Sequence, residues 1–445
     1  MVRAVGNAGN SEENGETENR VATENGSLRE SKVKRKIERP RGTRDFLPDE
    51  MEKRRAVERI MREIAESYGY REVCTPTFEH LELFTIKSGE GIVEEIYAFK
   101  DKSNRDLALR PELTAPVMRL FVNECSVMPR PLRFYYFANC FRYERPQKGR
   151  YREFWQFGVE LIGSDKPMAD AEVIGLAYRI LKELGIDFEL HIGHVGILRK
   201  LLSDLEPDLS SKIFRLIDKE QLDELESLMR DRGLDELYAK VSELISTKGD
   251  AGVIEKVREI LDSSVNEDLD YLKEVCSLLD SYGVEYVVDM SIVRGLDYYT
   301  GIVFEAYAEG LGAQKQVCGG GSYRLSHLFG GEDVPSTGFA IGFDRVMEVC
   351  RISPSRKLKV AVVDANCSRE AVRLAEMLRD RVKAAVIVDV MGRNLKKQLS
   401  HCSDADFAVI VGRKELEGGY YTLKDMRSGE QRKVGFEELV NILSS

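Results

Sequence analysis

The sequence predicts an α+β protein. We expect an antiparallel sheet of six or more strands flanked by helices. A helical insertion should interrupt this domain, and a C-terminal α/β domain should follow it. Strand-like alternation of apolar and polar residues occurs early in the chain and returns after residue 284. Leucine-rich, heavily charged helical periodicity fills the stretch between. Strands and helices alternate after residue 356, which is typical of a small domain with a mainly parallel sheet.

The composition is that of an ordinary soluble protein. The 445 residues are 43% hydrophobic and 32% charged, enough for two or three domains that each bury a core. A formal net charge of -10 argues against indiscriminate nucleic-acid binding but leaves room for a local basic surface. The eight cysteines form no CxxC pair and lack histidines at metal-ligand spacing, so we expect no metal site and no disulfide framework.

The N-terminal stretch and the hydropathy indicate where the protein resides. No apolar run reaches the roughly 18 residues that span a bilayer. The N-terminus has no apolar core for a signal peptide, and its glutamates argue against a transit peptide. We therefore expect a cytoplasmic protein with no membrane segment. Residues 1–38, rich in Glu, Asn, Gly and Ser, are expected to form a disordered tail.

Residues 39–190 are expected to form the first part of a catalytic domain. A long helix capped by Asp49 has apolar residues at helical spacing, namely Val57, Ile60, Met61 and Ile64. The other elements expected here are a strand near residue 73, a helix over 116–125, strands over 131–143 and 154–163, and a helix over 170–184.

The rest of the chain divides at changes of periodicity. Residues 191–280 are expected to be the helical insertion, 281–352 the second part of the catalytic domain, and 356–445 the C-terminal α/β domain. The second part should contain strands over 284–290, 301–307 and 316–319, and a strand end that runs into a helix over 337–349.

The stretch 141–160 carries polar residues where a buried sheet would carry apolar ones. Arg142 and Glu144 alternate in a strand-like run, a basic turn follows, and Gln156 and Glu160 lie on the returning strand. Burying arginine and glutamate destabilises a sheet unless a charged ligand meets them, so we interpret this hairpin as a binding site. The alternative is a solvated hairpin face with a mobile basic loop, which is common in antiparallel sheets.

Four polar sets in the catalytic domain together resemble the signature motifs of a class II aminoacyl-tRNA synthetase. They are Glu112 with Thr114; Arg142, Glu144, Gln156 and Glu160; residues 294–299 (RGLDYY); and residues 338–345 (GFAIGFDR). Together with residues 145–152 (RPQKGRYR), the RGLDYY run is similar to the histidyl-tRNA synthetase family in particular. The resemblance extends from about residue 40 to the end of the chain.

This resemblance implies a class II synthetase fold and an enzyme that uses ATP. The enzyme would activate L-histidine to histidyl-adenylate and pyrophosphate, then transfer histidine to the 3′ end of tRNA(His) for protein synthesis. Arg142, Arg294 and Arg345 are implied as catalytic residues, because fixed guanidinium groups stabilise charge that develops on the α-phosphate. The implied ATP contacts are Arg142, Glu144, Arg150, Phe154 and Arg345, with Mg²⁺ neutralising the triphosphate.

The resemblance also implies a histidine pocket. Glu112, Thr114 and Gln156 match the family's ammonium-binding residues, while Glu160 and Tyr298 match those that read the ring, with Tyr299 beside them. A site that hydrogen-bonds both ring nitrogens rejects other side chains by about 10⁴-fold or more, so no editing site is needed.

The same resemblance implies partners. The loop 145–152 would meet the tRNA acceptor end, and the insertion would clamp the acceptor stem. The C-terminal domain resembles the class II anticodon-binding module, with a dimer-bracing or purely structural domain as the alternative. The helix from Asp49 corresponds to the class's first motif, which implies a homodimer.

One stretch departs from the family's pattern, and one motif belongs to another class of synthetase. The family usually has an arginine after the glycine run and an acid two residues later, where this chain has Ser322 and Arg324, so any role of these two side chains stays open. His191 to His194 spells the HIGH motif of class I synthetases. No KMSKS motif follows and no nucleotide-binding βαβ unit precedes it, so we do not assign it that function.

Two other functions compete with the ligase. One is a synthetase-like regulatory subunit of histidine biosynthesis, although such relatives typically lack the C-terminal domain and have eroded ATP arginines. The other is a tRNA-sensing domain without catalysis, against which Arg142, Arg294 and Arg345 argue.

Overall fold

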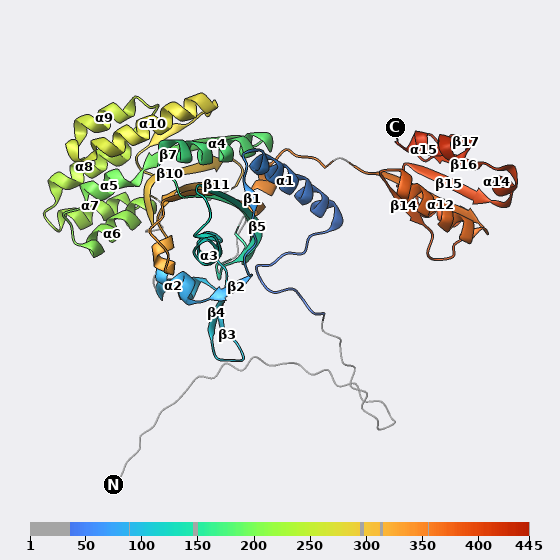
Figure 1. Cartoon of the computed structure of the whole chain (residues 1–445), viewed down its shortest axis with the longest axis horizontal. Coiled ribbons are helices and arrows are strands. Elements are labelled where there is room, and N and C mark those ends of the chain that lie inside the picture. The colour runs from blue at the N-terminus through green and yellow to red at the C-terminus, as the bar shows by residue number, and fades with distance from the viewer. Residues whose placement is uncertain are drawn as a thin grey trace, which may run out of the picture. The chain divides into compact units, whose positions relative to one another are not determined.

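The computed structural model describes residues 36–88, 90–145, 150–293, 298–311, 315–354 and 356–444 (Figure 1). Apart from its last three residues, the tail expected over 1–38 lies outside this part of the chain. Within the described residues, no helix combines the length and the apolar character needed to cross a membrane.

A nine-stranded sheet forms the centre of the catalytic domain. Its strand order is β1-β5-β6-β12-β11-β10-β7-β9-β8. The strands are β1 (Arg71–Glu72), β5 (Leu132–Phe141), β6 (Glu153–Ile162), β7 (Phe188–His194), β8 (Lys248–Gly249), β9 (Val287–Asp289), β10 (Tyr299–Ala308), β11 (Gln316–Tyr323) and β12 (Ser336–Gly342). The sheet of six or more strands is confirmed, but it is mixed, because β1 pairs with β5 and β7 pairs with β9 in parallel.

Helices cover both faces of this sheet. Figure 1 shows α3 (Thr114–Leu120) inside the curve of the sheet and α4 (Pro167–Glu183) on the opposite side. α1 (Pro48–Ser67) packs on α4, and so does α10 (Asn266–Tyr282). The residue before α1 is Leu47, which makes no side-chain cap, so Asp49 lies in the first turn of α1 and does not cap it as expected.

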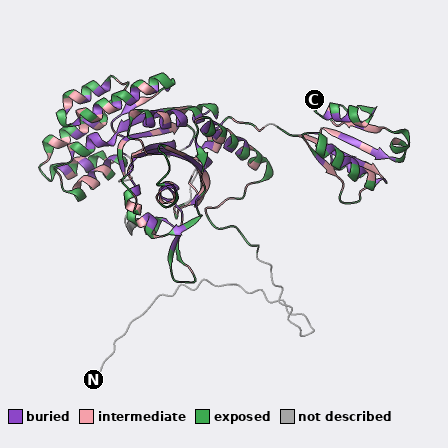
Figure 2. Cartoon of the chain, in the orientation of Figure 1, coloured by how far each residue is buried: buried purple, intermediate pink, exposed green. Residues whose placement is uncertain are grey.

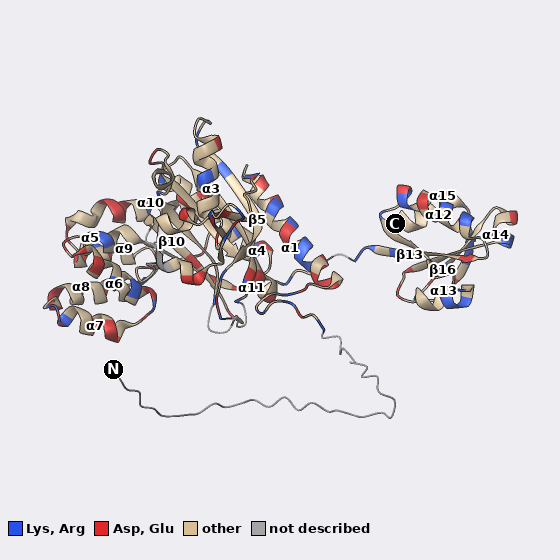
Figure 3. Ribbon diagram, turned by 90° about the horizontal axis from the view of Figure 1, so that it is seen from below, with Lys and Arg blue, Asp and Glu red and all other residues tan. Residues whose placement is uncertain are grey.

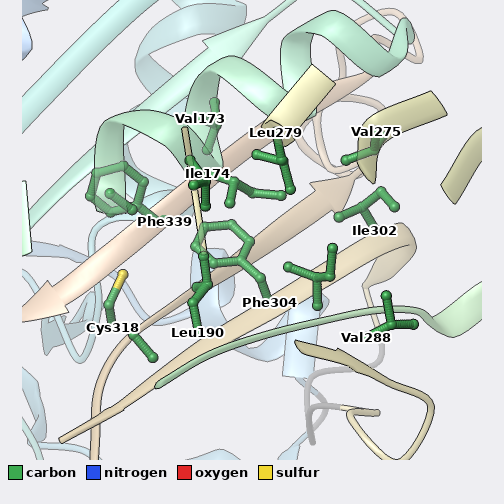
Figure 4. Close-up of a cluster of buried hydrophobic side chains, with 14 of the residues drawn as sticks. Val173, Ile174, Leu190, Val275, Leu279, Val288, Ile302, Phe304, Cys318 and Phe339 are labelled. Carbon is green, nitrogen blue, oxygen red and sulfur yellow. The ribbon is translucent and has the colours of Figure 1, made fainter. Parts of the chain in front are cut away.

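The alternation of β6 directs its side chains to two separate cores. Phe157, Val159 and Leu161 pack with α4 and α10 in a large apolar cluster, part of which Figure 4 shows around Phe304 and Phe339. Ile162 faces the other way, into a second cluster around α3. The strand period of two places Glu160 on the α3 side of the sheet. Figure 2 shows buried residues along α4 and the central strands.

Smaller elements complete the catalytic domain. A three-stranded sheet has the order β2-β4-β3, with β2 (Phe78–His80), β3 (Ala98–Lys100) and β4 (Asp106–Leu109). The helical elements are α2 (Glu82–Ser88), a 3₁₀ turn over Glu90–Glu95, a π-helical turn over Phe121–Cys125 that extends α3, a 3₁₀ turn over Ser326–Phe329, and α11 (Phe343–Val349).

The middle of the chain is helical, as the periodicity predicts. The helices are α5 (Val195–Leu201), α6 (Pro207–Asp218), α7 (Leu222–Arg230), α8 (Asp235–Ser246), α9 (Val253–Ile260) and α10, with a 3₁₀ turn over Ser263–Val265. Residue 191, where the insertion is expected to begin, lies within β7, a strand that pairs with β10. We therefore place the insertion from α5 onward.

The C-terminal residues form a separate α/β domain, as expected. Its sheet has the order β14-β13-β15-β16-β17, in which the first three strands are parallel and the last two antiparallel. The elements are β13 (Leu358–Ala365), α12 (Ser368–Arg381), β14 (Ala384–Val388), α13 (Leu395–His401), β15 (Phe407–Gly412), α14 (Arg413–Gly418), β16 (Tyr421–Asp425), β17 (Gln431–Val434) and α15 (Phe436–Ser444). Two apolar clusters of its own flank this sheet.

The contact of β11 with β12 requires glycine at position 320. A Cβ added to Gly320 would overlap the carbonyl oxygen of Gly338, which is backbone and has no room to move. Gly320→Ala should therefore lower the free energy of unfolding by about 1–3 kcal/mol or more, measured by urea unfolding. Gly301→Ala on β10 is the matched control, because its added Cβ meets nothing closer than 3.4 Å. Equal stability of the two variants would contradict this packing.

Candidate active site

Two adjoining pockets open on the α3 side of the sheet. The larger has a volume of about 1380 Å³ and is lined, among others, by Arg142, Glu144, Arg150, Phe154 and Arg345. The smaller, about 370 Å³, is lined by Glu112, Thr114, Glu160, Tyr298 and Tyr299 together with apolar residues. Arg142 and Gln156 line both pockets. The predicted site residues that lie within the described chain are thus brought together, while Arg294 lies outside it.

Glu160 is the most enclosed ionisable group of the smaller pocket. Only 1% of it is exposed, and its carboxylate accepts hydrogen bonds from the hydroxyls of Tyr136 (3.2 Å) and Tyr323 (2.5 Å). Burial raises the pKa of Glu160 to about 8, although the tyrosine hydrogen bonds oppose that rise. Burial and the nearby Glu160 carboxylate also raise the pKa of both tyrosines. Near neutral pH this site therefore favours a protonated carboxyl group that can donate as well as accept.

The start of α3 forms one wall of the smaller pocket. Glu112 accepts hydrogen bonds from the backbone N–H groups of Thr114 (2.6 Å) and Ala115 (3.2 Å). A carboxylate is stabilised at a helix N-terminus by these free N–H groups. Glu112 is therefore held in place before any ligand arrives.

Aromatic and amide groups complete this wall. The thiol of Cys140 lies 3.4 Å from the side-chain oxygen of Gln156. The rings of Tyr298 and Tyr299 are 4.6 Å apart, and Tyr298 meets Tyr323 edge to face at 5.9 Å. The smaller pocket therefore combines a fixed carboxylate, an amide, a buried carboxyl group and phenol hydroxyls.

The larger pocket gathers three guanidinium groups. Arg142 is held by the carbonyl of Pro111 (3.0 Å), and Arg345 donates to the carbonyl of Gln316 (2.8 Å). Arg150 lies 3.3 Å from the carboxylate of Glu144. Burial, together with the charges of Arg150 and Arg142, lowers the pKa of Arg345, so the three cations are close enough to repel one another. This arrangement favours a ligand with several negative charges.

An aromatic face lies beside these cations. The guanidinium of Arg142 is 5.2 Å from the ring centre of Phe154, which also lines the larger pocket. Flat aromatic rings next to an anion site suit a nucleotide, whose base can stack while its phosphates meet arginine.

The family of this chain follows from its sequence matches. A family model described as histidyl-tRNA synthetase matches residues 42–346, and one described as an anticodon binding domain matches residues 357–445. The chain belongs to the histidyl-tRNA synthetase family. It is 62% identical over 412 residues to a histidine--tRNA ligase of Archaeoglobus fulgidus, a match that covers 92% of this chain and 100% of that relative.

Solved structures agree with this family. An apo histidyl-tRNA synthetase from S. aureus is 28% identical with a TM-score of 0.70, covering 92% of this chain and 100% of that chain. A Bacillus halodurans C structure, described as an ATP phosphoribosyltransferase regulatory subunit/histidyl-tRNA synthetase, is 27% identical with a TM-score of 0.75. That match covers 84% of this chain and 98% of that chain.

The two departures from the family's pattern lie away from the reactive groups. The hydroxyl of Ser322 donates to Asp170 on α4 (2.8 Å), on the face of the sheet opposite α3. Arg324 pairs with Asp333 (3.0 Å) at the surface. Neither residue lines either pocket within the described chain.

The two histidines of the HIGH sequence lie on β7, in the interior of the domain. His191 lines the larger pocket, and its Nδ1 is hydrogen-bonded to Oδ2 of Asp289 (2.8 Å). His194 is buried, and that burial lowers its pKa to about 4. β7 pairs antiparallel with β10 and parallel with β9, and the whole helical insertion connects β7 to β9, so this is not the single-helix crossover of a nucleotide-binding βαβ unit.

Some residues of the site carry no motif of their own. The sequence did not indicate Tyr136 and Tyr323, which donate hydrogen bonds to Glu160. It also did not indicate Asp218 of α6, which lines both pockets. Strand alternation on β5 could have suggested Tyr136, because it pairs opposite Gly158 and so lies diagonally across from Glu160. No local pattern indicates Asp218, because it belongs to the insertion.

The raised pKa of Glu160 makes stability depend on pH. The folded protein keeps a proton on Glu160 up to about pH 8, whereas the unfolded chain loses it near its ordinary value of 4.5. Stability of the native chain should therefore fall as pH rises through this window. The glutamine of Glu160→Gln cannot ionise. The free energy of unfolding of this variant, relative to that of the native chain, should therefore rise by roughly a few kcal/mol between pH 5 and pH 8.

Urea unfolding at the two pH values measures this difference. Glu63→Gln, on the exposed side of α1, is the control and should track the native chain. A Glu160→Gln variant with the same pH dependence as the native chain would show that Glu160 is ionised when folded.

Proposed function

We propose that this chain activates L-histidine with ATP, forming histidyl-adenylate and pyrophosphate, and then transfers histidine to the 3′ end of tRNA(His). Membership of the histidyl-tRNA synthetase family and the histidine--tRNA ligase of 62% identity make it an aminoacyl-tRNA ligase of protein synthesis. The observation that supports the residue roles best is the pair of adjoining pockets, one rich in arginine and one built around a buried carboxyl group.

The smaller pocket suits histidine. Glu112, with Thr114 and Gln156, would hold the α-ammonium group, because the carboxylate is already fixed by the N–H groups of α3. Glu160 and Tyr298 would bind the two imidazole nitrogens, with Tyr299 packed beside them. A largely protonated Glu160 can donate to an unprotonated ring nitrogen or accept from a ring N–H, so its raised pKa suits a ligand that titrates near neutrality.

The larger pocket suits ATP. Arg142 would contact the α-phosphate, where negative charge develops during attack by the histidine carboxylate, and Arg345 would lie along the triphosphate. Glu144 and Arg150 would add ATP contacts, and Phe154 would stack on adenine. By family resemblance, Arg294 would reach the carboxylate and the α-phosphate from the other side.

Magnesium fits this site as an ion carried by ATP. Among the described residues, no three His, Cys, Asp or Glu side chains gather closely enough to hold a metal ion by themselves. Mg²⁺ commonly binds through substrate phosphates with few protein ligands, and when bound it neutralises charge on the triphosphate and pyrophosphate.

The tRNA contacts would come from three parts of the chain. The loop 145–152 would meet the acceptor end, the insertion would clamp the acceptor stem, and the C-terminal domain, matched as an anticodon binding domain, would read the anticodon. Basic and acidic residues are interspersed on the insertion helices (Figure 3), so any RNA contact there would rely on individual side chains. We also propose a homodimer formed through α1 and a cytoplasmic location.

The regulatory-subunit and tRNA-sensor alternatives are less well supported. The chain carries the anticodon binding domain, and Arg142, Arg150 and Arg345 converge in one pocket. A regulator or sensor has no need of three arginines placed for a triphosphate.

Exchange of pyrophosphate into ATP, measured with each of the twenty amino acids, tests the proposed function. Only L-histidine should support rapid exchange, because no other side chain presents two ring nitrogens to Glu160 and Tyr298. Purified protein that shows no histidine-dependent exchange would contradict the ligase function and favour the regulatory subunit.

Removing the guanidinium of Arg142 tests its catalytic role. Arg142→Ala should lower kcat of exchange by about 10²-fold or more, because the contact strengthens as charge develops on the α-phosphate. The KM for histidine should change much less. Arg324→Ala, at an exposed position in the same domain, is the control and should resemble the native chain. A variant that changes only KM would assign Arg142 to ground-state binding.

A further inference from the structure

Residues Gly42–Phe46, here termed the N-terminal strap, contact Tyr151 and Asp344, two residues that line the larger pocket. The strap directly precedes α1 and has no helix or strand of its own. Gly42 contacts the returning arm of the 145–152 loop. Arg44 contacts the first turn of α11, the helix that carries Arg345. Nothing in the family resemblance assigns these residues a role.

Asp344 fixes the strap to three other elements. Only 3% of it is exposed, yet one carboxylate oxygen accepts from Arg44 (2.7 Å) and from Arg54 of α1 (2.8 Å). The other oxygen accepts from the backbone N–H of Trp155 on β6 (2.7 Å). A buried carboxylate needs such donors, so Asp344 holds the strap, α1, β6 and α11 in one arrangement.

Arg44 also reaches the loop on the other side. Its guanidinium lies 3.9 Å from the ring centre of Tyr151, a cation–π contact. Next to it, the backbone carbonyl of Gly42 accepts from the N–H of Arg152 (2.8 Å). Gly42 has φ +85°, and a Cβ there would lie 2.7 Å from the Arg152 side chain, so glycine permits this close approach.

Three of the anchored residues are next in sequence to proposed ATP contacts. Tyr151 follows Arg150, Trp155 follows Phe154, and Asp344 precedes Arg345. Catalytic geometry needs such groups held within fractions of an ångström by a second set of contacts. The strap is positioned to supply part of that set.

We propose that Arg44 is a positioning residue that joins Tyr151 to Asp344 and thereby holds Arg150 and Arg345 at the spacing that ATP requires. Arg44 does not line either pocket, so it would act on ATP through the residues that it contacts. The proposal rests on the larger pocket being the ATP site. A purely structural role of Arg44 would lower stability without distinguishing ATP from histidine.

Steady-state exchange kinetics of Arg44→Ala, Arg44→Lys and Tyr151→Ala test the proposal. Arg44→Ala should raise the KM for ATP by about tenfold, which corresponds to about 1.4 kcal/mol of lost binding free energy. The KM for histidine should stay within about twofold of the native value. Arg44→Lys keeps the charge beside Asp344 but loses the planar face over Tyr151, so its KM should be intermediate. In the double variant Arg44→Ala/Tyr151→Ala, the KM for ATP should rise by less than the product of the rises in the two single variants.

Two comparisons separate the possible failures. Arg59→Ala, on the exposed side of α1, is the control and should match the native chain in both KM values. Equal rises in both KM values, or a lower unfolding temperature with an unchanged KM for ATP, would overturn the proposal. If the native chain shows no exchange, the ligase function fails first. Affinity for a fluorescent ATP analogue, compared between the native chain and Arg44→Ala, then still decides whether Arg44 positions the nucleotide site.

Discussion

The catalytic domain is organised by the cost of burying charge inside a β-sheet. Glu160 and Asp344 are both almost fully enclosed, and each is accommodated differently. Asp344 accepts hydrogen bonds from two guanidinium groups and a backbone N–H, and these donors compensate for its burial. Glu160 accepts hydrogen bonds from the uncharged hydroxyls of Tyr136 and Tyr323, and burial outweighs their effect and raises its pKa. The first carboxylate holds elements together, and the second is left poised for a ligand.

Local sequence patterns predicted the elements and the polar hairpin well. Strand alternation predicted the body of β5 and β6, and the polar residues at 142, 144, 156 and 160 indicated a site before any fold was known. The close approach of β11 to β12 accounts for the glycine at position 320. One error concerned an element end, at Asp49, where an acidic first turn resembles a cap. Another concerned the sheet, which is mixed because two strand pairs are parallel.

What the sequence did not indicate depends on contacts between distant residues. Arg44 and Asp344 are separated by 300 positions, and neither lies in a pattern that specifies the other. Tyr323 and Glu160 are 163 positions apart, so the pairing that sets the pKa of Glu160 appears only in the folded sheet. The course of β7 through residue 191 was equally hidden, because a buried strand and the start of a helical segment have similar apolar content.

A crystal structure with L-histidine and a non-hydrolysable ATP analogue tests the central claim, that the two pockets divide the two substrates. We predict that one imidazole nitrogen lies within hydrogen-bond distance of the Glu160 carboxyl group and the other near the Tyr298 hydroxyl. The α-phosphate should lie on Arg142, with adenine on Phe154. An imidazole ring bound elsewhere, with Glu160 bonded only to Tyr136 and Tyr323, would contradict the account.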